Sequence, residues 1–218
     1  MGKRIGLFGG SFDPPHLGHL ALALDILEAH RLDEIWFCPA YRTPFKASGC
    51  WADASHRWNM VQCVIASIPG FLALDFELRR KAPSYTVDTL RECRAREGHL
   101  GEGNQWFLLL GSDAALSFFR WHQPAEIIQL ATPLVGSRLD GEGRDRWREL
   151  LRASLRTEEE HCLGEALLRG ATRTRLFEIS SSEIRERVAS SRRIEHLVPT
   201  SVCRYIAEQG LYRSLREA

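Results

Sequence analysis

Short apolar runs that end in glycine or proline alternate with segments of helical periodicity along the first 135 residues of this chain. Residues 5–8 end at Gly9-Gly10, and residues 34–38 end at Pro39. Continuous apolar runs of this kind are typical of strands that are buried on both faces. Strands are expected at residues 5–8, 34–38, 71–76, 105–110, 132–135 and 175–179. Their alternation with helices predicts an α/β fold with a doubly wound parallel sheet.

The segments between the expected strands carry apolar residues at helical spacing, as Leu20, Ala23 and Ile26 do. Helices are expected at residues 17–29, from Asp53 or Ser55 to 65, and at 87–97, 114–119, 124–130, 182–190 and 199–209. The chain shows neither repeats nor a low-complexity linker. This predicts a single domain over residues 1–218 that is completed by C-terminal helices, with residues 138–174 peripheral to it.

The charge and the cysteine content narrow the classes of partner. The 29 basic and 28 acidic side chains leave a net charge of +1, which gives no overall field that favours nucleic acid or an acidic membrane. The first apolar run is too short for a signal peptide or a membrane span. The six cysteines include no CxxC pair, which is typical of reduced thiols. We therefore expect a cytoplasmic protein that binds neither nucleic acid nor membranes; no oligomeric state follows from the sequence.

The segment Gly9–His19, which follows the first expected strand, has the residues of an anion site. Its glycines let the backbone approach a ligand, and its prolines stiffen the entry to the helix. His16 and His19 are three residues apart and share one helix face, with Gly18 between them. A helix N-terminus offers N–H groups to an anion, and imidazoles can donate to phosphate oxygens. Zinc binding by the two histidines and a purely structural turn are the alternatives.

In doubly wound sheets the ligand lies beyond the carboxyl ends of the strands. Polar segments follow four of the expected strands in this way: residues 9–19, 39–46, 111–113 and 180–185. The sequence lacks the patterns GxGxxG, GxxxxGKS/T, HExxH and GxSxG. That absence disfavours a standard dehydrogenase, a P-loop NTPase, a zincin and an α/β-hydrolase.

A second polar segment, Ile179–Arg185, reads Ile-Ser-Ser-Ser-Glu-Ile-Arg. Taken alone, serines followed by a glutamate are typical of a helix cap and capping box. Together with the loop at residues 9–19, the segment suggests a phosphate site. Ser180, Ser181 and the helix N-terminus could hold phosphate oxygens, and Arg185, one turn further along, could clamp two of them.

The sequence His16-x-Gly18-His19, preceded by Gly-Gly-Ser-Phe-Asp-Pro-Pro, resembles the HxGH motif of the nucleotidyltransferase superfamily of adenylyl- and cytidylyltransferases. Residues 179–185 resemble the second motif of that superfamily, ISSTxIR, with Ser182 in place of threonine. Further segments are similar to nicotinate mononucleotide adenylyltransferases: residues 83–90, residues 111–114 together with Trp121, and residues 198–212. The resemblance covers most of residues 4–136 and 177–212.

The resemblance implies a Rossmann-like nucleotidyltransferase fold and a reaction between ATP and nicotinate mononucleotide that gives deamido-NAD and pyrophosphate. The implied catalytic residues are His16, His19, Lys46 and Arg185. The implied ATP-binding residues are Gly9, Gly10, Ser11, Phe12, His16, Gly18, His19, Gly111, Asp113, Ile179, Ser180, Ser181 and Arg185. The implied residues for nicotinate mononucleotide are Thr86, Trp121, His122 and Lys46. Mg²⁺ is expected to bind through substrate phosphates and water, with no protein metal ligand.

Several of these residues have simpler explanations. Asp113 could be an ordinary helix N-cap, and Trp121 could be a buried core residue. Lys46 follows Thr-Pro-Phe where the family has Pro-Pro-His, so its neighbour differs. The acceptor could instead be phosphopantetheine or another phosphorylated molecule, and the fold could serve as a non-catalytic nucleotide sensor. Thr86 and Trp121 favour a flat ring that carries a carboxylate.

Overall fold

The structure is a computed structural model that describes residues 2–44, 49–96, 103–137, 141–175 and 179–214. The chain divides into two compact units. Unit 1 comprises Met1–Phe8, Leu22–Trp36 and Tyr85–Leu176, and unit 2 comprises Gly9–Ala21, Phe37–Ser84 and Phe177–Ala218. Each unit is assembled from segments that are far apart in the sequence. The single domain expected from the sequence stays a prediction.

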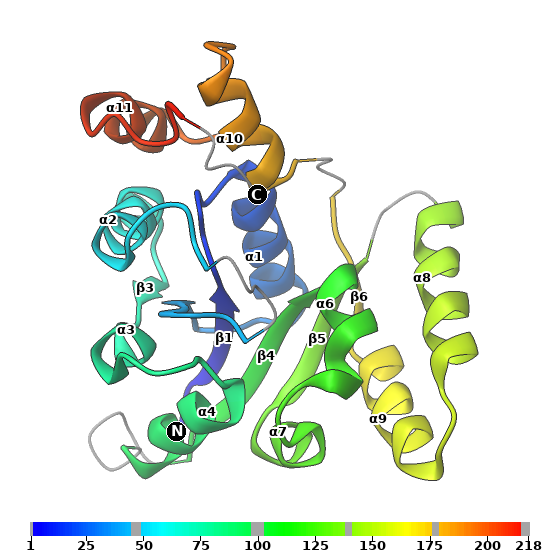
Figure 1. The fold of residues 1–218 in the computed structure, drawn as a ribbon. Helices are drawn as coiled ribbons and strands as arrows, with labels where there is room; N and C mark the ends of the chain where they lie inside the picture. Colours follow the sequence, from blue (N-terminus) through cyan, green and yellow to red (C-terminus); the bar gives the residue numbers. More distant parts are fainter. Residues whose placement is uncertain (1, 45–48, 97–102, 138–140, 176–178, 215–218) are drawn as a thin grey trace. The chain divides into compact units, whose positions relative to one another are not determined.

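Six strands form one parallel sheet with helices on both of its faces (Figure 1). The strands are β1 (Arg4–Gly10), β2 (Glu34–Pro39), β3 (Phe71–Ala73), β4 (Gln105–Gly111), β5 (Thr132–Ser137) and β6 (Ala171–Arg173). Their order in the sheet is β3-β2-β1-β4-β5-β6, so the order reverses between β1 and β4. The prediction of a doubly wound, Rossmann-like sheet is therefore confirmed.

The helices lie between the strands and after the last of them. They are α1 (Leu17–Ala29), α2 (Ala54–Ile65), α3 (Phe76–Arg80), α4 (Thr86–Ala95), α6 (Ser112–Ser117), α7 (Pro124–Leu130), α8 (Gly141–Ser154), α9 (Glu158–Arg169), α10 (Ser181–Ala189) and α11 (Thr200–Glu208), with a short 3-10 helix η1 (Phe118–Arg120). The predicted helices at 17–29 and 124–130 begin and end where expected. Within the described ranges, no helix is long and apolar enough to cross a membrane.

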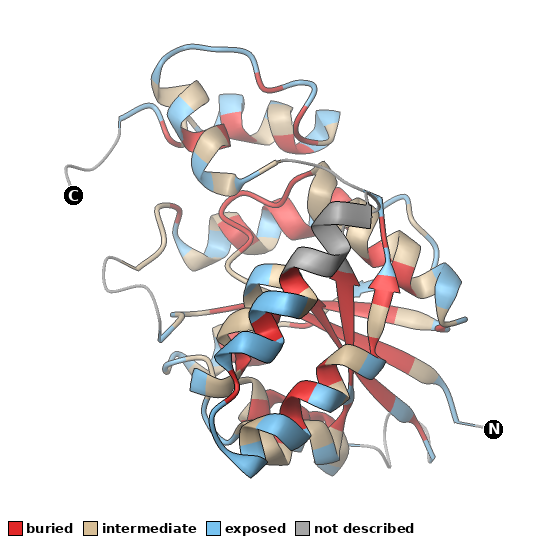
Figure 2. Ribbon diagram, turned by 90° about the vertical axis from the view of Figure 1, so that its right-hand side faces the viewer, coloured by how far each residue is buried: buried red, intermediate tan, exposed pale blue. Residues whose placement is uncertain are grey.

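In unit 1 the core surrounds β4. All residues from Trp106 to Leu110 are buried, as the continuous apolar run predicts. This strand pairs in parallel with β1 on one side and with β5 on the other. Figure 2 shows the strands mainly as buried, whereas the helices also carry exposed residues. Helices α8 and α9 contact β5 and bury Leu151 and Leu167, so the segment expected to be peripheral contributes to this core.

In unit 2 the core contains aromatic side chains of the loop after β1 and of strands β2 and β3. The ring of Phe12 lies 5.7 Å from that of Phe37, which lies 5.2 Å from that of Phe71, between ring centroids. Helices α2 and α11 contact each other. Asn59 Nδ2 on α2 donates to the hydroxyl of Tyr205 on α11 at 2.9 Å. The C-terminal helices therefore belong to the same unit as the loop at residues 9–19.

Two strands differ from the sequence-based prediction. β3 comprises only Phe71–Ala73, because helix α3 begins at Phe76 within the apolar run. The prediction of a strand at residues 175–179 is wrong for the described part of that segment, since β6 runs over Ala171–Arg173 and pairs with β5. This short strand reads Ala-Thr-Arg, which has no apolar run for a pattern search to find.

The packing of α8 can be tested with two neighbouring leucines. Leu151 is 0% exposed, whereas Leu150 is 49% exposed. Leu151→Ala is expected to lower the free energy of unfolding by about 2–5 kcal/mol, because it leaves a cavity in the core of unit 1. Leu150→Ala should change that free energy by less than about 0.5 kcal/mol. Urea unfolding followed by circular dichroism measures both, and equal effects would show that α8 does not bury Leu151.

Candidate active site

The loop after β1 begins at the carboxyl end of the strand where the order of the sheet reverses. Ligands of doubly wound folds bind at such a point. An added Cβ at Gly9 would meet no atom within 4 Å, so the backbone of this residue borders open space. At Gly10 the added Cβ would lie 3.1 Å from the ring of Phe12. Gly9 therefore gives a ligand close access to the backbone, while Gly10 makes room for Phe12.

Phe12 stabilises the loop from inside unit 2. Its backbone φ is 48°, in the left-handed region that residues other than glycine seldom adopt. Its buried ring contacts that of Phe37 and meets that of His19 edge to face, with 5.1 Å between the His19 and Phe12 centroids. Packing on two sides offsets the strain of such a backbone, which is about 1–3 kcal/mol.

His16 and His19 lie side by side at the start of α1, with half-buried Gly18 between them. Their ring centroids are 3.7 Å apart, and the backbone N–H of His16 donates to Nδ1 of His19 at 3.2 Å. Because this Nδ1 accepts a hydrogen bond, it carries no proton, and the proton of a neutral His19 lies on Nε2. His19 is therefore prepared to donate a hydrogen bond from Nε2.

His16 is buried, and burial lowers its pKa from 6.5 to about 4. Its Nδ1 has no hydrogen-bond partner among the described residues. Buried polar atoms without a partner are exceptions in folded proteins and call for an explanation. An uncharged imidazole that can still donate one hydrogen bond to a ligand suits a site for phosphate oxygens.

Asp13 is only 2% exposed, and its carboxylate accepts three hydrogen bonds within the protein. Oδ2 accepts from the backbone N–H of Trp51 at 2.6 Å. Oδ1 accepts from the backbone N–H of Ala52 at 3.0 Å and from the hydroxyl of Tyr212 at 2.8 Å. Burial, followed by the charge of Asp13, raises the pKa of Tyr212, so the hydroxyl stays protonated and remains a donor. The carboxylate thus joins the loop to two distant parts of the chain.

Arg57 on α2 is a buried arginine that sequence reasoning did not select. Its guanidinium donates to the backbone carbonyls of Ser11 (2.8 Å), Ala40 (2.6 Å), Tyr41 (3.2 Å) and Ala52 (3.1 Å). One side chain therefore fixes the loops that follow β1 and β2. A signal was present in the sequence, because Arg57 shares a helix face with Met60 and Val64, where a charge needs buried partners.

The serine-arginine segment contacts the same loop within unit 2. Ser180 caps α10, and its Oγ accepts from the N–H three residues further on at 3.1 Å, so the helix-cap explanation holds for this residue. Ser181 Oγ donates to the carbonyl of Pro14 at 2.9 Å, and Arg185 Nη1 donates to that of Asp13 at 2.7 Å. The partners are 167 and 172 positions apart in the sequence. The structure therefore brings the two sequence motifs together.

Arg185 is held in place by further contacts. Its Nη2 donates to Ser182 Oγ at 3.0 Å, and its guanidinium carbon lies 5.4 Å from the ring centroid of Trp51. Ser182 supplies this acceptor with the same hydroxyl group that threonine would provide. The arginine is thus oriented by the protein before any ligand binds.

In unit 1, the residues expected to bind the mononucleotide belong to two segments. Thr86 is the first residue of α4, and the half-buried Trp121 follows η1, with its ring 5.3 Å from that of Phe118. The neighbours of these two residues meet, because the rings of Tyr85 and His122 are 4.7 Å apart. The explanation of Trp121 as a fully buried core residue is wrong, since part of its side chain is exposed.

Of four other predicted site residues, three lie in the described part of the chain and one does not. Gly111 ends β4 and precedes α6 as its N-cap, so the explanation of Asp113 as the N-cap is wrong. Asp113 is exposed in the first turn of that helix. Ile179 is half-buried and directly precedes the cap residue of α10. Lys46 lies outside the described residues.

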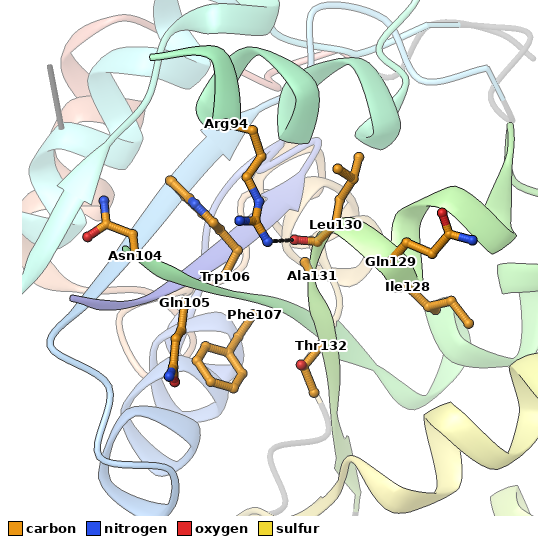
Figure 3. Close-up of a pocket in the computed structure, with 10 residues that line it drawn as sticks. All are labelled: Arg94, Asn104, Gln105, Trp106, Phe107, Ile128, Gln129, Leu130, Ala131 and Thr132. Carbon is orange, nitrogen blue, oxygen red and sulfur yellow. Dashed lines mark hydrogen bonds between the residues drawn. The ribbon is translucent and has the colours of Figure 1, made fainter. Parts of the chain in front are cut away.

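A pocket of about 220 Å³ lies in unit 1 at the amino-terminal ends of β4 and β5 (Figure 3). Arg94 of α4 points across it, and its Nη2 donates to the carbonyl of Leu130 at 2.9 Å. None of the residues that the sequence predicts for substrate binding lines this pocket. It is therefore separate from the candidate active site.

The sheet order and the hydrogen bonds between residues 179–185 and the loop after β1 are those of a nucleotidyltransferase fold. A model of the Cytidylyltransferase-like family matches residues 7–187. The fold is shared with the nicotinic acid mononucleotide adenylyltransferase of Plasmodium falciparum, solved in complex with NaAD. That comparison has a TM-score of 0.70 and 21% identity, and it covers 99% of this chain and 100% of that chain.

Two curated relatives make the family more specific. A "Probable nicotinate-nucleotide adenylyltransferase" of Pseudomonas fluorescens is 38% identical over 216 residues, which cover 98% of this chain and 99% of that protein. The nicotinate-nucleotide adenylyltransferase of Bacillus subtilis is 34% identical over 212 residues, which cover 97% of this chain and 100% of that protein. The chain therefore belongs to the nicotinate-nucleotide adenylyltransferase family.

The burial of His16 predicts an unusual titration. In the unfolded chain its pKa returns to 6.5, so between pH 6.5 and about 4 the unfolded state binds more protons than the folded state. The contribution of His16 therefore lowers stability as the pH falls through this window. NMR of the substrate-free protein should give a midpoint near pH 4 for this ring, and His16→Asn should lose less stability on acidification. A midpoint near the ordinary value would contradict the burial of the imidazole.

Proposed function

We propose that this chain transfers the adenylyl group of ATP to nicotinate mononucleotide, giving deamido-NAD and pyrophosphate in NAD biosynthesis. Curated relatives that match nearly the whole chain bear the name of this activity. The observation that carries the proposal is the junction of the two motifs in unit 2. There Ser181 and Arg185 form hydrogen bonds with the loop that bears His16 and His19.

We propose that ATP phosphates bind at this junction, where the first turns of α1 and α10 offer N–H groups to an anion. The proposed ATP-binding residues of unit 2 are Gly9, Gly10, Ser11, Phe12, His16, Gly18, His19, Ile179, Ser180, Ser181 and Arg185. Two residues of unit 1, Gly111 and Asp113, complete the proposed set. An added Cβ at Gly111 would meet no atom within 4 Å, which supports close access to a ligand. The exposed carboxylate of Asp113 suits ribose hydroxyl groups as donors.

The reaction needs no covalent enzyme intermediate. A phosphate oxygen of the mononucleotide attacks the α-phosphorus of ATP in line, and a new P–O bond forms. The bond from that phosphorus to the bridging oxygen breaks, and pyrophosphate leaves with the electron pair. His19 would donate from Nε2 to an α- or β-phosphate oxygen, because its Nδ1 is engaged by the N–H of His16. Arg185 and Lys46 would offset the charge that develops on the leaving group.

We propose that Thr86, Trp121, His122 and Lys46 bind nicotinate mononucleotide. The exposed part of the Trp121 ring can stack on an electron-poor pyridine ring. The hydroxyl of Thr86 can donate to the ring carboxylate. The contact between the neighbouring rings of Tyr85 and His122 supports this assignment, because it brings the two segments together within unit 1.

A divalent metal is typical of this family. Among the residues that the structure describes, no group of three or more His, Cys, Asp or Glu could hold a metal ion. We propose that this metal is Mg²⁺ and that it binds through the phosphate oxygens of ATP and water. Mg²⁺ would withdraw negative charge from the phosphates. A cytoplasmic location stays a prediction.

Pyrophosphate release from ATP tests the proposed function. The assay compares nicotinate mononucleotide, its amide analogue and phosphopantetheine as acceptors, each with Mg²⁺ present. Nicotinate mononucleotide should support the highest kcat/KM, because a ring carboxylate suits the hydroxyl of Thr86. Release with none of the three would contradict an enzymatic function, and a preference for either other acceptor would contradict the assigned substrate.

The role of His19 predicts a loss of turnover without a loss of fold. His19→Ala should lower kcat by about 100-fold or more, because a donor to the phosphate oxygens is removed. His161→Ala, which removes an exposed histidine on α9, is the matched control and should retain normal turnover. Normal kcat in a folded His19→Ala protein would show that this histidine does not act on the phosphates.

A further inference from the structure

Arg91 on α4 connects this helix to the start of α7 within unit 1. Its Nε donates to Glu126 Oε1 at 2.7 Å, and its Nη2 donates to Glu126 Oε2 at 2.6 Å. Such a two-bonded arginine-carboxylate pair fixes orientation as well as distance. Nη2 also donates to Gln123 Oε1 at 2.7 Å. One side chain of α4 therefore holds two residues near the beginning of α7.

Gln123 is the residue at which the chain turns from Trp121 into α7. Its backbone φ is 52°, in the left-handed region, and it is the N-cap residue of that helix. Directly before it, His122 contacts the ring of Tyr85, the residue that precedes Thr86. The bond from Arg91 to Gln123 therefore stabilises a turn whose other residues are the proposed binding groups for the pyridine ring.

The side chain of Arg91 is partly exposed, and two carboxylates of the protein balance its charge. Its guanidinium nitrogens lie 2.6 Å from a carboxylate oxygen of Glu126 and 3.0 Å from one of Asp88. The hydrogen bond from Arg91 also lowers the pKa of Glu126, so this pair stays ionised at neutral pH. An arginine with two carboxylate partners is suited to hold the turn, and poorly suited to bind a further carboxylate on the substrate.

A second arginine joins the same two helices at their other end. Arg94 Nη2 donates to the carbonyl of Leu130, the last residue of α7 (Figure 3). Figure 1 shows α4 and α7 next to each other, as their contacts require. The two arginines therefore have separable effects. Arg94 anchors the end of α7, whereas Arg91 anchors the turn that precedes it.

We propose that Arg91 is a positioning residue for the acceptor substrate, which sets the 121–123 turn and so orients Trp121 and His122 relative to Thr86. The proposal rests on the proposed function of these three residues. Without the guanidinium, the hydrogen bond from α4 to the side chain of Gln123 would be lost, and the left-handed backbone of Gln123 could relax to a more favourable conformation. The aromatic surface for the pyridine ring would then be misplaced while the ATP-binding residues of unit 2 stay unchanged.

Arg91→Ala is the direct test, with KM measured separately for each substrate while the other is saturating. The KM for nicotinate mononucleotide should rise roughly tenfold, since small displacements of positioning groups weaken binding. The KM for ATP and kcat should stay within about twofold of the wild type, since neither depends on the turn. Arg91→Lys keeps the charge but loses the two-bonded geometry, so it should recover only part of the difference.

Two further variants separate positioning from simple destabilisation. Arg94→Ala removes the other arginine between the same helices and should leave the KM for nicotinate mononucleotide unchanged. Gln123→Ala removes only the acceptor on the turn and should raise that KM as Arg91→Ala does. An unchanged KM in both Arg91→Ala and Gln123→Ala, or an equal rise in Arg94→Ala, would overturn the proposal. Failure of the proposed function is distinguishable, because the wild-type protein would then release no pyrophosphate.

Discussion

The buried carboxylate of Asp13 forms the hydrogen bonds on which the loop after β1, at residues 9–19, depends. The carboxylate oxygens accept from the backbone N–H groups of residues 51–52 and from the hydroxyl of Tyr212. The backbone carbonyl of Asp13 accepts from Arg185. A buried charge is stable only when its hydrogen bonds are complete, and losing one partner leaves a costly unpaired group. Within unit 2, the carboxylate therefore joins the loop after β1 to residues 51–52 and to Tyr212 near the end of the sequence.

The surroundings of this carboxylate give the loop its chemical character. Arg57 donates hydrogen bonds to the backbone carbonyls of Ser11, within the loop, and of Ala40. Its positive charge is therefore held there by carbonyl oxygens and not by a second carboxylate. Burial lowers the pKa of His16 and so favours its neutral ring. The backbone N–H of His16 donates to Nδ1 of His19 and so selects the tautomer of His19 that can donate from Nε2. These features are set by contacts within the protein. A preorganised loop of this kind loses little conformational freedom when it binds its ligand, which favours the transfer of an adenylyl group by positioning and charge neutralisation.

The sequence predicted the features of the fold that depend on residues close together in the chain. The boundaries of α1 and α7 and the order of strands and helices follow from apolar periodicity and from proline at the start of α7. The resemblance to the family is confirmed, and Ser181 and Arg185 do lie against the loop after β1. Periodicity could not reveal partners such as Asp13 and Tyr212, which are 199 positions apart. It also missed β6, because this short strand has no apolar run. It could not indicate the proposed positioning role of Arg91, because that role depends on a contact with Gln123 at the start of another helix.

The most direct test of the role of Asp13 is the affinity of Asp13→Asn for a non-hydrolysable ATP analogue, measured by titration calorimetry. Asparagine keeps the shape of the side chain, but its amide N–H₂ would face a backbone or hydroxyl donor, so the loop should lose its fixed conformation. Binding is expected to weaken roughly 10- to 100-fold in protein that circular dichroism shows to be folded. An affinity equal to that of the wild type would contradict the dependence of the proposed phosphate-binding loop on this carboxylate.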